Sequence, residues 1–155
     1  MLEMKFSYQD KKIVLINTHN SAFDKGDLKN KQMNYIKNKA IEEYKKGNYV
    51  AIGRDWNMLF PGVSFNQFDS KQGVPEWTKK IDSDLMSSKW QWVFDPNVPT
   101  ARTADSCYQK GVNYRTIIDG FLLSPNIEVL KVKTDNLNFQ FTDHNPVFLK
   151  LRLKT

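Results

Sequence analysis

Cysteine is almost absent from this chain of 155 residues, in which Cys107 is the only one. A single cysteine excludes an internal disulfide and a zinc site built from several thiolates. Long apolar runs are also missing. The apolar runs are short, and Ile-Val-Leu-Ile at residues 13–16 is one example. A membrane-spanning helix needs about 20 apolar residues. No apolar leader follows Met1, so we expect no signal peptide.

The motifs of two common catalytic designs are missing too. The sequence contains no glycine-rich phosphate-binding loop and no Gly-x-Ser-x-Gly segment for a serine nucleophile. Positive charge is in mild excess, with a formal net charge of +6. A solvated lysine-rich surface is the interpretation we favour, and a basic groove for nucleic acid is the alternative. The 40% hydrophobic content and the length indicate one globular unit.

The first half of the chain predicts a strand, a helix and a second strand. β-Branched apolar runs at residues 13–16 and 49–52 are typical of strands buried on both faces. Between them, apolar residues from Leu28 to Tyr44 recur at helical spacing, and Gly47 is placed to end the helix. Asp24 or Asp27 is expected to cap its start. This order favours a layered α/β or α+β arrangement.

The second half of the chain predicts a loop, one further helix and several strands. Residues 60–72 have the composition of a loop, and a second helix is expected after Pro75, with Trp77, Ile81 and Leu85 on one face. Four further strands are predicted, at residues 90–94, 116–123, 128–133 and 147–153.

Ionisable and amide side chains gather at the ends of the predicted strands. Each group taken alone is typical of a turn or a helix cap. Asp119 differs, because it interrupts an apolar run, and an inward carboxylate is costly unless it is paired. We therefore expect Asp119 to meet a histidine or a cation. The clustered residues are Asn17, His19, Asn20, Asp55, Asn57, Asp119, Asp143 and His144.

These residue types suit the hydrolysis of a phosphate ester. That reaction needs a divalent cation held by carboxylate oxygens, a group that orients water, and a positive charge near the phosphate. Asp143 can supply a metal ligand, and Asp55 can orient or deprotonate water while Asn57 holds its geometry. His144 can face the phosphate, with Asp119 fixing its tautomer and favouring its protonated form.

The order of four motifs resembles that of the endonuclease/exonuclease/phosphatase superfamily, which has the deoxyribonuclease-I-like fold. The motifs are Asn-Thr-His at 17–19, Gly-Arg-Asp-Trp-Asn at 53–57, Ile-Asp-Gly-Phe at 118–121 and Thr-Asp-His-Asn-Pro-Val at 142–147. The resemblance implies a four-layer α/β sandwich of two packed, mostly antiparallel sheets flanked by helices.

The resemblance also implies roles for individual residues. Asp143 would bind Mg²⁺ or Mn²⁺, and five residues would be catalytic: His19, Asp55, Asn57, Asp119 and His144. Arg54 departs from the family pattern, because many members have glycine there, and we favour a surface role for it.

A larger departure is that the family's upstream Asn and metal-binding Glu have no counterpart before His19. We therefore expect residues 1–155 to form a partial domain without its N-terminal part. Such a chain would bind metal weakly. It would also expose strand edges that favour self-association or pairing with the missing part.

Three functions remain open at this point. The first is a metal-dependent phosphoesterase acting on a phosphodiester or a phosphomonoester, with nucleic acid among the substrate classes, and impaired in this chain. The second is an inactive binding or assembly module that keeps the fold. The third is a basic nucleic-acid-binding domain, which would not explain the carboxylates of the cluster.

Overall fold

The computed structural model describes residues 1–24 and 27–154, and a five-stranded sheet in the order β1-β2-β3-β7-β4 lies at its centre. Its strands are β1 (Leu2–Tyr8), β2 (Lys11–His19), β3 (Tyr49–Asp55), β4 (Gln91–Val93) and β7 (Asp119–Leu123). β2 and β3 are parallel, and every other neighbouring pair is antiparallel. Helix α1 (Leu28–Lys45) connects β2 to β3. The predicted strand–helix–strand unit is therefore confirmed.

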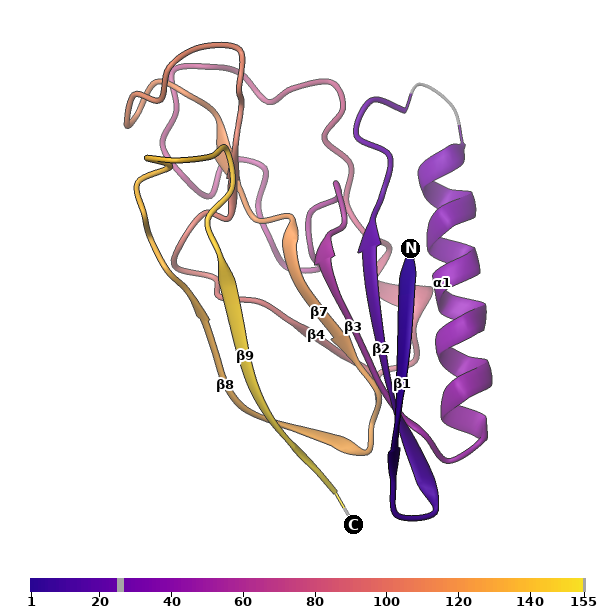
Figure 1. The fold of residues 1–155 in the computed structure, drawn as a ribbon. Coiled ribbons are helices and arrows are strands. Elements are labelled where there is room, and N and C mark those ends of the chain that lie inside the picture. Colours follow the sequence, from indigo (N-terminus) through magenta and orange to yellow (C-terminus); the bar gives the residue numbers. More distant parts are fainter. Residues whose placement is uncertain (25–26, 155) are drawn as a thin grey trace.

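The remaining strands form two small sheets. One pairs β5 (Ala101–Arg102) with β6 (Arg115–Thr116), and the other is a ribbon of β8 (Ile127–Thr134) and β9 (Val147–Leu153). Figure 1 shows helix α1 on one side of the central sheet and the β8–β9 ribbon on the other. The described residues thus form three layers, and the prediction of packed, mostly antiparallel sheets is confirmed.

Alternation along the strands builds a separate apolar core on each face of the sheet, because successive side chains point to opposite sides. Val14 and Ile16 of β2 pack with Ile36 of α1. Ile13 and Leu15 face the other way, into a cluster that includes apolar residues of β8 and β9. The sheet is therefore covered on both faces, which explains why its strands have continuous apolar runs.

Helix α1 begins and ends close to the predicted positions. Asp27 occupies the N-cap position, where its carboxylate accepts from Nδ2 of Asn30 at 2.8 Å and makes no capping bond. The Asp24 carboxylate accepts a hydrogen bond from the backbone N–H of Lys29 at 2.9 Å. At the other end Gly47 has a φ of 82°, the left-handed conformation that favours glycine. The predicted start of the helix near Asp24 and Asp27 and its predicted end at Gly47 are thus confirmed.

The prediction of a helix after Pro75 is wrong. The described chain there has only a single 3-10 turn, η1 (Ser83–Leu85). Backbone bonds to Leu59 hold the segment extended, since Leu59 N–H donates to Lys79 O at 2.8 Å and Ile81 N–H donates to Leu59 O at 2.9 Å. Pairing with a distant loop therefore overrides the helical spacing of the apolar residues.

Two strands differ from the sequence-based expectation. β1 was not predicted, because its apolar residues alternate with polar ones on an edge strand and all four of them, Leu2, Met4, Phe6 and Tyr8, are exposed. The strand predicted at 116–123 is divided into β6 and β7, with residues 117 and 118 between them. The Oγ1 atom of Thr100 accepts the backbone N–H groups of Ile118 and Asp119, both at 3.0 Å. That side chain takes the place of a strand partner.

Among the described residues, no helix has both the length and the apolar character that crossing a bilayer requires.

Candidate active site

At one edge of the central sheet, the last residues of β2 and β3 lie beside the first residue of β7. Three of the predicted site residues therefore lie in one row. In the sheet register His19 of β2 lies opposite Asp55 of β3, and Asp55 lies opposite Asp119 of β7. Cross-strand partners point to the same face of a sheet. Segments about 100 residues apart in sequence therefore place their side chains side by side.

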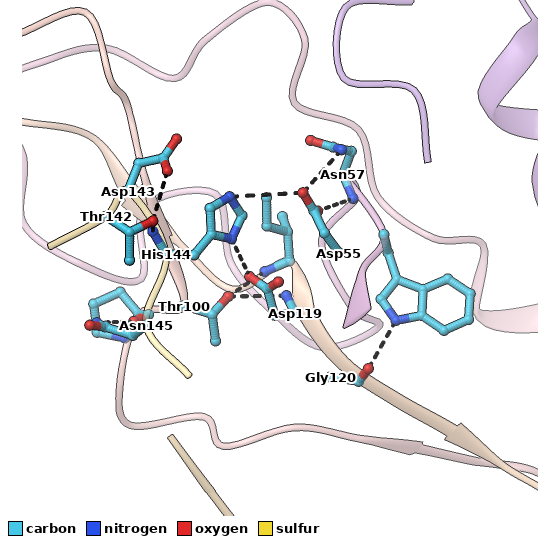
Figure 2. A network of polar contacts seen from close by, with 12 residues as sticks. Asp55, Asn57, Thr100, Asp119, Gly120, Thr142, Asp143, His144 and Asn145 are labelled. Carbon is cyan, nitrogen blue, oxygen red and sulfur yellow. Dashed lines mark hydrogen bonds and ion pairs between the residues drawn. The ribbon is translucent and has the colours of Figure 1, made fainter. Parts of the chain in front are cut away.

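His144 joins this row from the loop before β9. Its Nδ1 atom lies 2.8 Å from Oδ2 of Asp119, and its Nε2 atom lies 3.8 Å from Oδ2 of Asp55 (Figure 2). The expectation that Asp119 meets a histidine is confirmed. The bond to Asp119 fixes the orientation of the ring and leaves Nε2 directed toward Asp55.

The loop after β3 orients the Asp55 carboxylate. Its Oδ1 atom accepts the backbone N–H of Asn57 at 2.8 Å, and its Oδ2 atom accepts from Nδ2 of Asn57 at 3.2 Å. The same amide donates to the carbonyl of Asn20 at 2.7 Å. Asn57 itself has a φ of 49°, a left-handed conformation that asparagine tolerates. Asn57 therefore joins the ends of β2 and β3 and holds the carboxylate in place.

His19 is the exposed member of the cluster. Its Nε2 atom lies 3.4 Å from Oδ2 of Asp55, while 60% of its side chain is accessible to solvent. The buried carboxylate of Asp55 thus lies between two imidazoles, His19 on the open side and His144 on the inner side.

The electrostatic field of the cluster favours a charged His144. Burial alone would lower the pKa of this imidazole, but the hydrogen bond to Asp119 and the charges of Asp119, Asp55 and Asp143 outweigh it and raise the pKa from 6.5 to about 9. Burial and the charge of Asp119 raise the pKa of Asp55. At neutral pH the site therefore contains an imidazolium beside a carboxylate whose basicity is increased.

Asp143 lies next to His144 but does not point into the Asp55 cluster. Its Oδ1 atom accepts a hydrogen bond from the hydroxyl of Thr142 at 3.2 Å, and its backbone carbonyl accepts from Arg102 N–H at 3.0 Å. Figure 2 shows the Asp143 carboxylate joined to Thr142 and set apart from the His144 ring. Asp143 is thus separate from the row of strand-end residues.

One open cleft of about 1050 Å³ is lined by the candidate site residues His19, Asp55, Asn57, Asp119, Asp143 and His144. Arg54, Arg102 and the exposed ring of Phe23 also line it, together with Trp77. The cleft combines carboxylates at its floor with cationic and aromatic side chains around them. Such a combination suits a ligand that has both phosphate and flat apolar groups.

Arg54 has an unusual backbone conformation. Its φ is 106°, in the region that favours glycine, which agrees with glycine at this place in many members of the family it resembles. The expectation that Arg54 is exposed is confirmed, although the same residue lines the cleft. Backbone strain of this kind is concentrated at functional sites.

Two buried residues that support the site were not found from the sequence. Lys29 of α1 is fully buried, and its Nζ atom donates to the carbonyls of Asn57 at 3.0 Å and Trp77 at 2.9 Å. Burial lowers the pKa of this lysine, and the charge of Lys79 acts in the same direction. Lys29 lies in the first turn of α1, where a lysine is normally exposed. The spacing of apolar residues along the helix therefore did not predict that its side chain is buried.

The second supporting residue is Thr100, whose hydroxyl holds the backbone at Asp119. Its own carbonyl accepts the backbone N–H of Asn145 at 2.8 Å, so Thr100 joins the loops that carry Asp119 and His144. Thr100 lies in a polar loop, where a threonine is common. Its role in holding the backbone at Asp119 is visible only from its hydrogen-bond partners.

The donor atoms of the cluster fit a divalent cation. Within the part of the chain that the structure describes, the one group of three potential ligands is Asp55, Asp119 and His144, whose ligand atoms lie within 4.8 Å of one another. Carboxylate oxygens suit hard cations, and an imidazole widens the choice to transition metals. Asp143 offers a further oxygen at the rim of the cleft.

The sequence matches no protein-family model and no curated protein sequence. The fold, however, is similar to solved structures of tyrosyl-DNA phosphodiesterase 2 (TDP2), a member of the endonuclease/exonuclease/phosphatase superfamily. One is D. rerio TDP2 complexed with a single-strand DNA product, with a TM-score of 0.63 and 14% identity over 97% of this chain. Another is TDP2 from C. elegans, with a TM-score of 0.57 and 16% identity over 94% of this chain.

This similarity confirms the predicted fold. The chain spans 60% of the length of the D. rerio structure and 44% of the C. elegans structure. About two fifths of the first neighbour therefore has no counterpart among the residues of this chain.

Proposed function

We propose that this chain is part of a metal-dependent phosphodiesterase that acts on single-stranded nucleic acid. The observation that carries the proposal is the row of His19, Asp55 and Asp119 at three strand ends, joined by His144 at 2.8 Å from Asp119. The D. rerio neighbour is described with a single-strand DNA product. The open cleft and the net charge of +6 suit a polyanionic substrate.

In this proposal the chain's own residues position water and phosphate. Asp55, with its raised pKa, accepts a proton from the attacking water, and Asn57 keeps its carboxylate in place. His144 is protonated at neutral pH and donates from Nε2 to a phosphoryl oxygen, while Asp119 holds its ring. His19, on the open side, contacts the phosphate or assists the leaving group.

Mg²⁺ or Mn²⁺ is the proposed cofactor, with Asp143 as its ligand from this chain. A bound divalent cation supplies charge neutralisation at the phosphoryl oxygens. Asp55, Asp119 and His144 could also hold a cation, but in this proposal they act in proton transfer and phosphate binding, which leaves Asp143 as the metal ligand from this chain. One carboxylate is a poor Mg²⁺ site, because the ion prefers several hard oxygen ligands. We therefore propose that residues 1–155 form a partial domain with weak metal binding and low turnover on their own.

A further polypeptide would complete such a site. The chain would pair either with an N-terminal part, as its neighbours' greater length favours, or with a second copy of itself. An inactive assembly module and a nucleic-acid-binding domain without chemistry are the competing functions.

The test is turnover of a 5′-labelled single-stranded oligonucleotide and of bis-p-nitrophenyl phosphate, with Mg²⁺ or Mn²⁺. His144→Ala and Asp143→Ala should each reduce turnover at least about a hundredfold, because the first removes an acid–base group and the second removes a metal ligand. Their melting temperatures should stay near that of the parent. Asp84→Ala removes an exposed carboxylate that does not line the cleft, and it should leave turnover unchanged.

The outcomes separate the competing functions. Equal turnover in the parent and in His144→Ala would overturn the site assignment. Oligonucleotide binding without turnover at any metal concentration would favour a binding domain. Absence of both binding and turnover would favour an assembly module.

A further inference from the structure

Arg54 has a backbone conformation that is costly for an arginine. Its φ of 106° lies in the region that favours glycine, because the Cβ atom of any other residue is crowded there. Glycine at this position would avoid the strain. A strained residue at a functional site is often part of the mechanism, so the arginine side chain is the place to look for a function.

The strand register shows what this conformation does to the side chain. Successive side chains of a strand point to opposite faces, and Ile52 packs in the core that includes Ile36 of α1. Regular alternation would therefore direct residue 54 toward that core. Arg54 is instead exposed, and it lines the cleft of the candidate site. The positive φ thus accompanies a cationic side chain that lies at the cleft and outside the core.

The other cationic side chains that line the cleft already have partners. The two histidines face the carboxylates of the cluster. Arg102 donates from Nη1 to the carbonyl of Thr103 at 2.7 Å and to the carbonyl of Ser106 at 3.1 Å. Its guanidinium also lies 5.9 Å from the ring centre of Tyr108. Arg102 is therefore held by its own loop.

Arg54 has no comparable partner. Within residues 1–24 and 27–154, its guanidinium makes no hydrogen bond, ion pair or ring contact. The nearby carboxylates are engaged, since Asp119 pairs with His144 and Asp55 accepts from Asn57. A guanidinium presents N–H donors in a planar fork that matches two phosphate oxygens, and it is weakly hydrated. Arg54 thus offers the cleft a set of unused donors for an oxyanion.

The lining of a second cavity shows on which side of the site Arg54 lies. This groove of about 860 Å³ is located between the central sheet and the β8–β9 ribbon. Arg54 and His144 line both the cleft and the groove, whereas Asp55 and Asn57 line the cleft alone. Arg54 is therefore on the His144 side, away from the residues proposed to activate water. A phosphate held there would be a neighbour of the phosphate that is cleaved.

Aromatic side chains in the same cleft indicate what kind of phosphate compound would fit. Phe23 is 85% exposed, and Trp77 lines the cleft as well. Exposed aromatic rings beside a cationic groove are the combination that binds single-stranded nucleic acid, because bases stack on the rings while the backbone follows the charge. A nucleic-acid strand also supplies phosphates in succession.

We infer that Arg54 binds a second phosphate next to the one that is cleaved. Arg54 would then make the site select a strand of consecutive phosphodiesters over an isolated phosphodiester. This inference rests on the phosphodiesterase proposed above and adds a specificity-determining residue to it. Arg54 contacts the substrate outside the reacting atoms and takes no part in proton transfer.

The test measures the affinity of the intact chain for thymidine trinucleotides without metal, so that binding is separated from turnover. TpTpT has two charged phosphodiesters. Two matched trimers each have one of these linkages replaced by a neutral methylphosphonate, which keeps all three bases. NMR titrations give the dissociation constants. We expect TpTpT to bind at least about tenfold more tightly than either matched trimer, because one charge-assisted contact is lost in each.

Three variants separate the side chain of Arg54 from its backbone. Arg54→Gln removes the charge and keeps a Cβ atom, Arg54→Gly removes both, and Arg54→Lys keeps the charge without the planar fork. The preference for TpTpT should fall below about threefold in the first two and lie between those values in the third. Lys31→Gln, at an exposed position of α1 outside the cleft, should leave the preference unchanged.

Thermal unfolding adds a readout that a purely structural role would not give. Arg54→Gly should melt at a higher temperature than the parent, because glycine relieves the strain at φ 106°. Its affinity for TpTpT should nevertheless fall. A residue that only supports the fold would lose stability and affinity together.

Three results would overturn the inference: no binding of TpTpT in the millimolar range, equal affinity for all three trimers, and a preference that Arg54→Gln leaves intact. The two proposals can fail separately. An Arg54-dependent preference without turnover at any metal concentration would contradict the phosphodiesterase and support the phosphate contact. Turnover that depends on His144, together with a preference that is independent of Arg54, would contradict the phosphate contact alone.

Discussion

Asp119 determines the charge of His144, because its carboxylate accepts from Nδ1 at 2.8 Å and is the main favourable influence on the imidazolium. Asp119→Asn removes that charge and keeps the side chain's size. We expect the pKa of His144 to fall from about 9 toward the ordinary value of 6.5. An NMR titration of the imidazole measures it directly. A midpoint that stays near 9 in the variant would show that another group sustains the charge.

Arg54 provides a second prediction at this scale. Its φ of 106° is costly for a residue with a Cβ atom, so Arg54→Gly should raise the free energy of unfolding by about 1 kcal/mol. Urea denaturation measures the change. Because the arginine lines the cleft, the same variant should bind a single-stranded oligonucleotide more weakly. A variant that is less stable than the parent would contradict the assignment of strain.

At the scale of elements, the close contact between β7 and its surroundings depends on Gly120. A Cβ atom there would lie 2.7 Å from the backbone oxygen of Val93 and 2.7 Å from the ring of Phe60. Gly120→Ala should therefore destabilise the protein by about 2 kcal/mol, since a backbone atom cannot easily move away. Gly73→Ala is the matched control, because nothing lies within 4 Å of its added carbon. Thermal unfolding of the two variants side by side measures the difference.

Helix α1 is tied to β1 through Glu43, which is 1% exposed. Burial alone would raise the pKa of this carboxyl, but bonds from Lys5, Lys46 and Asn48 outweigh it and lower the pKa from 4.5 to about 2. Its stabilising effect is therefore complete above pH 4.5 and is lost as the pH falls toward 2. Glu43→Gln should be less stable than the parent at pH 7, and the difference should shrink over that acidic range. A constant difference from pH 7 to pH 2 in urea titrations would contradict this account.

The sequence was most informative where local pattern and tertiary structure agree. Residues 147–153 form β9 over the predicted range, with burial that alternates along the strand. The apolar spacing from Leu28 to Tyr44 lies within α1. The segment after Pro75 shows the opposite case, because backbone bonds to Leu59 hold it extended despite helical spacing. Edge strand β1 was missed because half-exposed apolar residues resemble an ordinary surface.

At the scale of the whole molecule, the residues of the candidate site were identifiable but their supports were not. Polar groups that interrupt or end apolar strands are visible in a sequence, and Asp119 was expected to need a partner for that reason. Lys29 and Thr100 act through bonds to the backbone of distant segments, at Asn57 and Asp119. No local pattern encodes such contacts, because they exist only after the segments have met.

The row of cross-strand partners at the end of β3 has a further consequence for the behaviour of the sheet in alkali. Asp55 and Asp119 are directly opposite one another, and the imidazolium of His144 lies against both carboxylates. The stabilising effect of that positive charge is complete below about pH 6.5 and is lost as the pH rises through about 9. Two adjacent carboxylates then repel without compensation. The β3–β7 ladder should therefore fray from its Asp55 end above this pH, before the remaining strands separate, so that His144 also holds the ends of β3 and β7 together.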